Sequence, residues 1–164
     1  MNMSLKIKSL LLSTVLFCLS ATASHATDSL KFSAAYIPEA PPGAQVLAGF
    51  MYIHNPSNQA IEITAVSSPN FDSVEMHLSK EVNGIAKMLP QKSLKIVANS
   101  TLALRPGSYH LMLIKPKQAI RGGDNALIKF SLSNSTTQEL QIAVKKKLKK
   151  ARIMKCAAGK CGGG

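Results

Sequence analysis

Two histidines and two methionines occupy positions from which their side chains could hold one metal ion. His110 and Met112 are two residues apart in the segment "YHLMLI", whose apolar composition is typical of a strand. Residues two apart on a strand point to the same face, so the imidazole and the thioether project together. Leu111 and Leu113 then face the other way, into a core. This segment therefore offers one half of a candidate metal site.

The other half is expected at a hairpin. Two apolar segments flank Asn83-Gly84, a dipeptide that favours a two-residue turn because both residues tolerate positive φ. With that turn, Ser79 lies opposite Met88, and His77 is the diagonal neighbour of Met88 at roughly 7–8 Å between Cα atoms. A longer loop shifts this register slightly and still keeps the two side chains close. The hairpin therefore supplies a second imidazole and a second thioether.

The chemistry of these four side chains favours monovalent copper. Thioether sulfur is a soft, neutral ligand that discriminates against calcium and magnesium and selects Cu(I). Zinc prefers thiolate, imidazole and carboxylate ligands. A blue-copper centre needs a cysteine thiolate, and residues 27–144 contain no cysteine. The alternative is that the methionines fill gaps in the core and that the histidines are ordinary surface or hydrogen-bonded residues. The candidate Cu(I) ligands are His77, Met88, His110 and Met112.

The segments that must position these side chains are short and strand-like. Roughly ten apolar or alternating runs follow one another with turn residues between them, and no window before the basic end shows a helical period. This pattern predicts an all-β sandwich or barrel in a single domain. The expected strands include residues 30–37, 46–54, 60–67, 72–79, 85–89 and 109–114.

The N-terminal part of the chain is typical of a cleaved secretory signal. Lys6 and Lys8 precede an apolar run at residues 10–19, and small residues follow as far as Ala26. The run is too short to span a bilayer, which needs about 20 apolar residues. Cys18 lies inside the run, in a poor setting for lipid attachment. We therefore predict a signal peptide at residues 1–26, export to the periplasm and no transmembrane segment.

The positive charge of the chain is concentrated at its C-terminal end. Residues 27–144, the predicted domain, hold ten Lys and Arg against eight Asp and Glu, whereas residues 145–164 hold eight Lys and Arg and no acid. A basic tail of this kind is either a flexible, solvated end or a segment that contacts anionic surfaces. Nucleic acid is not an expected partner, because the protein is predicted to be exported and no aromatic residues interleave the lysines.

The tail also contains soft ligands. Met154, Cys156 and Cys161 lie close together near its glycine-rich end. They could form a secondary Cu(I) site or pass copper on, because sulfur ligands select this ion. The two cysteines could instead form a disulfide in an oxidising compartment, or have no role. The residues alone leave these alternatives open.

The spacing of the four candidate ligands resembles the H-x10-M-x21-H-x-M motif of the periplasmic PCu(A)C copper chaperones. The segments "GIAKMLP", "LRPGSYHLMLI" and "GGDNALIKFSL" are similar to segments of that family, and the likeness covers roughly residues 33–144. One departure is Leu78, at a position where family members often have methionine. Met76 stands on the other side of His77 instead, and its alternation predicts a core position.

The resemblance implies a cupredoxin-like Greek-key β-sandwich or barrel that binds one Cu(I) through His77, Met88, His110 and Met112. It also implies delivery of copper for the copper-A centre in subunit II of cytochrome c oxidase, often alongside a thiol-containing Sco-type copper protein. We accordingly expect a monomeric periplasmic metallochaperone that holds its copper at an exposed site.

Two other functions fit the sequence. The protein could store or detoxify periplasmic copper, with the cysteine-containing tail adding capacity. It could also be an exported β-sandwich interaction module without metal, in which histidine and methionine serve packing. An enzyme is not expected, because the sequence offers no plausible pair of nucleophile and base, no paired carboxylates and no phosphate-binding loop.

Overall fold

The computed structural model describes residues 29–146, which form ten strands and no helix. The all-β prediction is therefore confirmed. The predicted signal peptide and the soft ligands Met154, Cys156 and Cys161 lie outside the described residues. Within the described part, no helix is present that could cross a membrane. The strands are β1 (Lys31–Pro38), β2 (Val46–Asn55), β3 (Ile61–Ser67), β4 (Phe71–Val82), β5 (Ile85–Gln91), β6 (Leu94–Ile96), β7 (Ser100–Leu104), β8 (Tyr109–Pro116), β9 (Asn125–Leu132) and β10 (Thr137–Lys145).

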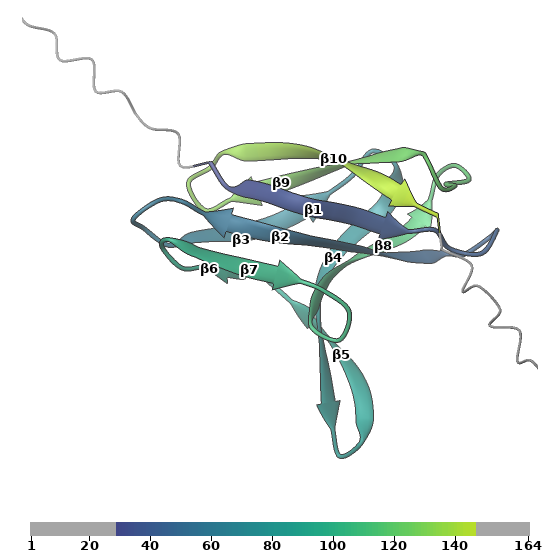
Figure 1. The fold of residues 1–164 in the computed structure, drawn as a ribbon, viewed down its shortest axis with the longest axis horizontal. Coiled ribbons are helices and arrows are strands. Elements are labelled where there is room, and N and C mark those ends of the chain that lie inside the picture. Colours follow the sequence, from purple (N-terminus) through teal and green to yellow (C-terminus); the bar gives the residue numbers. More distant parts are fainter. Residues whose placement is uncertain (1–28, 147–164) are drawn as a thin grey trace, which may run out of the picture.

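The strands form one continuous sheet that folds over itself into two layers, in the order β5-β4-β8-β7-β2-β1-β10-β9-β3-β6. The strands from β5 to β1 make one layer, and those from β10 to β6 make the other (Figure 1). A short parallel pairing of β1 with β10, at Ile37–Val144 and Pro38–Lys145, joins the layers. The result is a nearly closed, barrel-like sandwich, as the regular short strands of the sequence predict.

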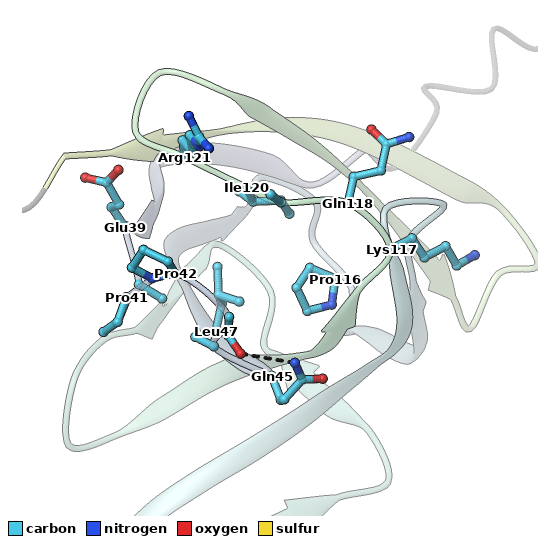
Figure 2. A pocket seen from close by; sticks show the side chains of 14 residues that line it. Glu39, Pro41, Pro42, Gln45, Leu47, Pro116, Lys117, Gln118, Ile120 and Arg121 are labelled. Carbon is cyan, nitrogen blue, oxygen red and sulfur yellow. Dashed lines mark hydrogen bonds between the residues drawn. The ribbon is translucent and has the colours of Figure 1, made fainter.

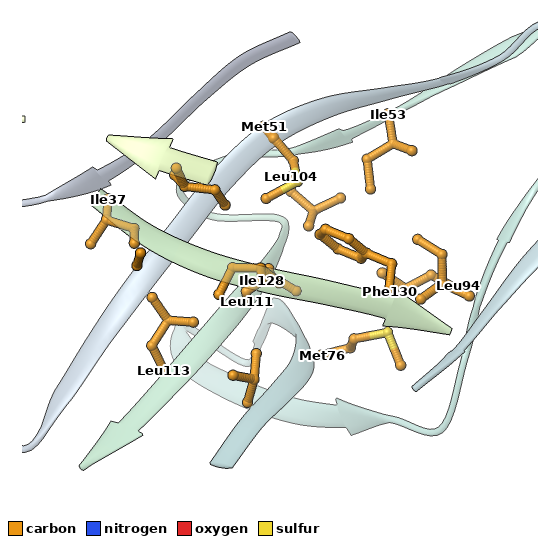
Figure 3. Close-up of a cluster of buried hydrophobic side chains, with 14 of the residues drawn as sticks. Ile37, Met51, Ile53, Met76, Leu94, Leu104, Leu111, Leu113, Ile128 and Phe130 are labelled. Carbon is orange, nitrogen blue, oxygen red and sulfur yellow. The ribbon is translucent and has the colours of Figure 1, made fainter. Parts of the chain in front are cut away.

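The core lies between the two layers and is filled by alternate residues of the strands. Leu111 and Leu113 of β8 belong to one buried cluster with Ile128 and Phe130 of β9, and all four are fully buried (Figure 3). Met76 of β4 belongs to the same cluster, which agrees with the core position expected for it. Each large apolar side chain buried in this way stabilises the fold by about 1.5–3 kcal/mol. The opposite faces of β4 and β8 remain outside the core.

Strand β4 is long, and together with β5 it extends beyond the sandwich as a hairpin (Figure 1). Asn83 and Gly84 make the turn with φ of 54° and 75°, which is the conformation that a two-residue hairpin turn requires. Ser79 pairs with Met88, so the register predicted from the sequence is confirmed. Pro90 is tolerated in β5 because this strand lies at the edge of the sheet, where a missing N–H donor costs little.

Candidate metal centre

The two candidate histidines lie directly opposite each other on neighbouring strands. β4 and β8 form an antiparallel ladder in which His77 pairs with His110. The ring centroids are 5.9 Å apart and the ring planes are inclined at 47°. Only 8% of His77 and 6% of His110 is exposed. The strand pairing therefore places two imidazoles side by side, away from most of the solvent.

The ring of His110 is oriented by a backbone carbonyl. Its Nδ1 lies 3.1 Å from the oxygen of Ser108, and because a carbonyl oxygen only accepts, Nδ1 donates the hydrogen. The same oxygen accepts the backbone N–H of Ser79 at 3.1 Å, which ties the turn before β8 to β4. The other ring nitrogen of His110, Nε2, is left with its lone pair.

The ring of His77 is held by a carboxylate. Its Nε2 lies 2.8 Å from Oε2 of Glu75, whose side chain is about half exposed. The other nitrogen of this ring, Nδ1, is buried and has no hydrogen-bond partner within the described residues. Buried polar atoms are nearly always paired in folded proteins. An unpaired nitrogen in a ring that lies beside a second imidazole is therefore well suited to bind a metal ion.

The two methionines lie on the same face of the sheet as the histidines. Residues that pair directly across strands share a face, and Met112 is opposite Glu75 while Met88 is opposite Ser79. Met112 is half-buried, whereas Met88 is 63% exposed. The structure thus brings all four predicted residues to one face of β5, β4 and β8, with the imidazoles inside and one thioether at the open edge.

The ligand types at this face fit a soft cation. Among residues 29–146, no group of three or more His, Cys, Asp and Glu side chains is arranged to hold a metal ion. Beside the two imidazoles, the thioethers of Met88 and Met112 are the further soft ligands on this face. Two neutral imidazoles and two neutral thioethers match the preference of Cu(I).

Sequence reasoning missed two residues of this centre, Glu75 and Ser108. Each stands two positions before one of the histidines and binds a ring nitrogen of it. The period of two along a strand could have placed Glu75 on the face of His77, because alternate residues share a face. The Ser108 contact uses a backbone oxygen in a turn, so no side-chain pattern signals it.

A separate open pocket of about 670 Å³ lies between the loop before β2 and the loop after β8 (Figure 2). Pro41, Pro42, Leu47, Pro116 and Ile120 provide much of its wall. Its lining contains no histidine, cysteine or methionine. This pocket therefore has none of the ligands that a soft metal ion requires and is distinct from the candidate metal centre.

Sequence comparison places the folded part of the chain in a recognised group of proteins. The family described as "Putative lipoprotein LpqE-like" matches residues 30–144. A relative from Leifsonia xyli subsp. xyli, named "Putative lipoprotein Lxx21020", is 28% identical over 119 residues, which are 72% of this chain and 70% of that protein. An uncharacterised protein of Rickettsia prowazekii is 26% identical over 98 residues, which are 59% of this chain and 54% of that protein.

Structure comparison finds PCuAC domains. A copper-bound PCuAC domain from PmoF2 superposes with a TM-score of 0.61 at 16% identity, over 72% of this chain and 93% of that domain. The solution structure of CuI-DR1885 from Deinococcus radiodurans gives a TM-score of 0.54 at 25% identity, over 70% of this chain and 77% of that one. Its apo form gives 0.57 at 23% identity, over 90% and 98%. The predicted cupredoxin-like fold of the PCu(A)C type is thereby confirmed.

Proposed function

Because the chain belongs to the LpqE-like family and has the fold of PCuAC domains, we propose that it is an exported copper chaperone that binds one Cu(I). Its ligands in this proposal are His77, Met88, His110 and Met112. The observation that carries the proposal is the placement of these four side chains on one face, around two imidazoles whose centroids are 5.9 Å apart. The copper forms named for PmoF2 and DR1885 support it.

The graded exposure of the ligands supports a role in transfer. The buried imidazoles of His77 and His110 hold the ion from the inside, and the exposed thioether of Met88 closes the site from the solvent side. A thiolate of an acceptor protein can approach from that side and replace a thioether, because thiolate is an anionic soft ligand and thioether is neutral. Copper can then leave by stepwise ligand exchange without unfolding of the β4–β8 ladder.

The proposed acceptor is the copper-A centre in subunit II of cytochrome c oxidase, reached directly or through a Sco-type thiol copper protein. This finer assignment follows from the resemblance of the ligand spacing to the PCu(A)C chaperones. The lipoprotein description of the family and of the Leifsonia relative supports export, and we propose the periplasm as the compartment. In this role the protein carries copper as cargo and catalyses no reaction.

Competitive Cu(I) titration against a chromophoric chelator, under anaerobic reducing conditions, tests the proposal. The protein from Thr27 onwards is compared with a Cys156→Ser/Cys161→Ser variant, which removes the thiols of the tail. One tight equivalent in both proteins supports a chaperone with its site in the β domain. Several equivalents that require the cysteines favour storage instead. Binding that disappears with the cysteines, or no binding in either protein, contradicts the four-ligand site.

A further inference from the structure

We infer that Glu75 is a positioning residue that fixes His77 in the tautomer whose Nδ1 binds copper. The inference rests on the proposed function, since it concerns how that same site is prepared for its ion. In this assignment copper is bound by different nitrogens of the two imidazoles, by Nδ1 of His77 and by Nε2 of His110.

The argument begins with the contact between Glu75 and His77. The two residues are two apart on β4, so their side chains share a face, and Oε2 of the carboxylate lies 2.8 Å from Nε2 of the ring. This separation is typical of a charge-assisted hydrogen bond. An ionised carboxylate can only accept, so the hydrogen resides on Nε2 and the lone pair of the neutral ring resides on Nδ1.

In this tautomer the nitrogen that carries the lone pair is the buried one. Nδ1 of His77 is inaccessible to solvent and has no hydrogen-bond partner in the described part of the chain. A buried, unpaired nitrogen is exceptional in a folded protein and calls for an explanation. A metal ion that uses the lone pair of this atom supplies one.

The ring of His110 completes the arrangement. Its Nδ1 donates to the carbonyl oxygen of Ser108 at 3.1 Å, which leaves the lone pair on Nε2. The ring centroids lie 5.9 Å apart. A metal–imidazole bond of about 2 Å on each side, added to the radius of each ring, spans roughly 6 Å between centroids. One ion therefore fits between the two rings when one nitrogen of each is turned toward it.

Glu75 can act in this way without entering the ligand set. A carboxylate that accepts the second N–H of a ligating histidine orients the ring and increases its basicity, and loss of such a group typically lowers metal affinity about 10–100-fold. Glu75 also pairs with Met112 across the β4–β8 ladder, so its negative charge lies beside the proposed site of a monovalent cation.

The test combines nitrogen NMR of the copper-free protein with Cu(I) titration. Long-range ¹H–¹⁵N spectra of the histidine rings should show His77 protonated on Nε2 and His110 protonated on Nδ1. Glu75→Ala should remove the tautomer preference of His77 and weaken Cu(I) binding about 10–100-fold. Glu75→Gln, whose amide oxygen can accept the same hydrogen bond, should retain the tautomer and most of the affinity.

Glu81→Ala is the matched control, because Glu81 is an exposed carboxylate on the same face of β4 that pairs with Ala86 and not with a histidine. It should change neither the tautomer nor the affinity. The inference is overturned if His77 carries its hydrogen on Nδ1 in the unsubstituted protein. It is also overturned if Glu75→Ala leaves tautomer and affinity unchanged, or weakens binding only as much as Glu81→Ala does. If the tautomers are as inferred and Cu(I) does not bind, the proposed function fails while the positioning of the ring stands.

Discussion

At the scale of single residues, the candidate site has a closed side and an open side. His77 and His110 are buried, Met112 is half-buried and Met88 is exposed. The hydrogen bonds to Glu75 and to the carbonyl of Ser108 restrict the two rings further. Ligands that are held rigidly lose little freedom when the ion binds, whereas an exposed thioether on a flexible side chain is replaced at little cost. The arrangement therefore suits an ion that must be bound selectively and then released.

The exposed methionine provides the clearest test at this scale. Met88→Leu removes the sulfur and keeps an apolar side chain, so it should weaken Cu(I) binding by about tenfold or more, equivalent to about 1.4 kcal/mol. The stability of the fold should change by less than about 0.5 kcal/mol, because the side chain is exposed. Chelator competition and urea denaturation measure the two quantities.

Met76→Leu is the control for this change. Met76 lies on the same strand as His77, but its side chain is in the core on the other face of the sheet. A swap of similar volume there should cost less than about 1.5 kcal/mol of stability and leave Cu(I) affinity intact. If Met88→Leu binds Cu(I) as tightly as Met76→Leu does, Met88 is not a ligand.

At the scale of elements, the β4–β5 hairpin decides where Met88 lies. The hairpin extends beyond the two layers (Figure 1), and within residues 29–146 the ladder partner of β5 is β4. Lys80 lies directly opposite Lys87 in this ladder, and like charges in that position repel. The turn at Asn83-Gly84 therefore contributes much of what keeps the hairpin in register.

Gly84→Ala should weaken copper binding by loosening this turn. Gly84 has a φ of +75°, and a methyl group added to its Cα would have no neighbouring atom within 4 Å, so the strain is in the backbone alone. Placing alanine in the left-handed region costs about 1–2 kcal/mol. We expect the hairpin to fray and Cu(I) affinity to fall several-fold, as measured by titration.

Gly43→Ala is the matched comparison for the turn. Gly43 has a φ of +79°, is equally free of neighbours and lies in the loop between β1 and β2. It should carry a similar backbone cost without affecting copper binding. A loss of affinity shared by both glycine variants would mean that general destabilisation, and not the hairpin, is responsible.

At the scale of the whole molecule, the core and the candidate site use opposite faces of the same strands. Met76, Leu111 and Leu113 pack against the second layer. The side chains next to them in the sequence, those of His77, His110 and Met112, point away from this core to the other face of the sheet. The closely packed core fixes the spacing of β4 and β8. The rigid half of the site is thus a consequence of packing that involves none of its ligands.

Stability and copper affinity should respond separately to a core change in the second layer, because such a change should leave the backbone ladder between β4 and β8 intact. Phe130 is fully buried on β9 and stacks on Phe32 with 4.7 Å between ring centroids. Phe130→Ala should lower the free energy of unfolding by about 3–5 kcal/mol. Cu(I) affinity of the protein that remains folded should stay the same. Urea denaturation measures the first effect, with Val97→Ala at an exposed position as the control. A parallel fall in copper affinity would contradict this separation.

Copper itself should stabilise the folded molecule. A ligand present at 100 times its dissociation constant and bound only by the native state adds about 2.7 kcal/mol to the free energy of unfolding. Anaerobic thermal unfolding of the Cys156→Ser/Cys161→Ser variant should show this as a rise in Tm with Cu(I). The rise should be lost when Met88→Leu and Met112→Leu are added. An unchanged Tm in the variant with all four ligands would favour the interaction module without metal.

Patterns among residues close together in the sequence were enough to predict the strand faces and the hairpin register of the candidate site. Period-two alternation puts His110 and Met112 on one face and Leu111 in the core, and the structure agrees. The Asn83-Gly84 turn sets the pairing of Ser79 with Met88, because a two-residue turn leaves a hairpin one register. Both features depend on residues close in the chain, so sequence by itself determined them.

Tertiary structure alone decided how the two halves of the site meet. β4 and β8 are separated in the chain by three other strands, and the pairing of His77 with His110 follows from how the core packs them side by side. The burial of the unpaired Nδ1 of His77 depends on that packing as well. Contacts between distant strands reflect the burial of apolar surface across the whole sandwich, a quantity that no short segment of sequence contains.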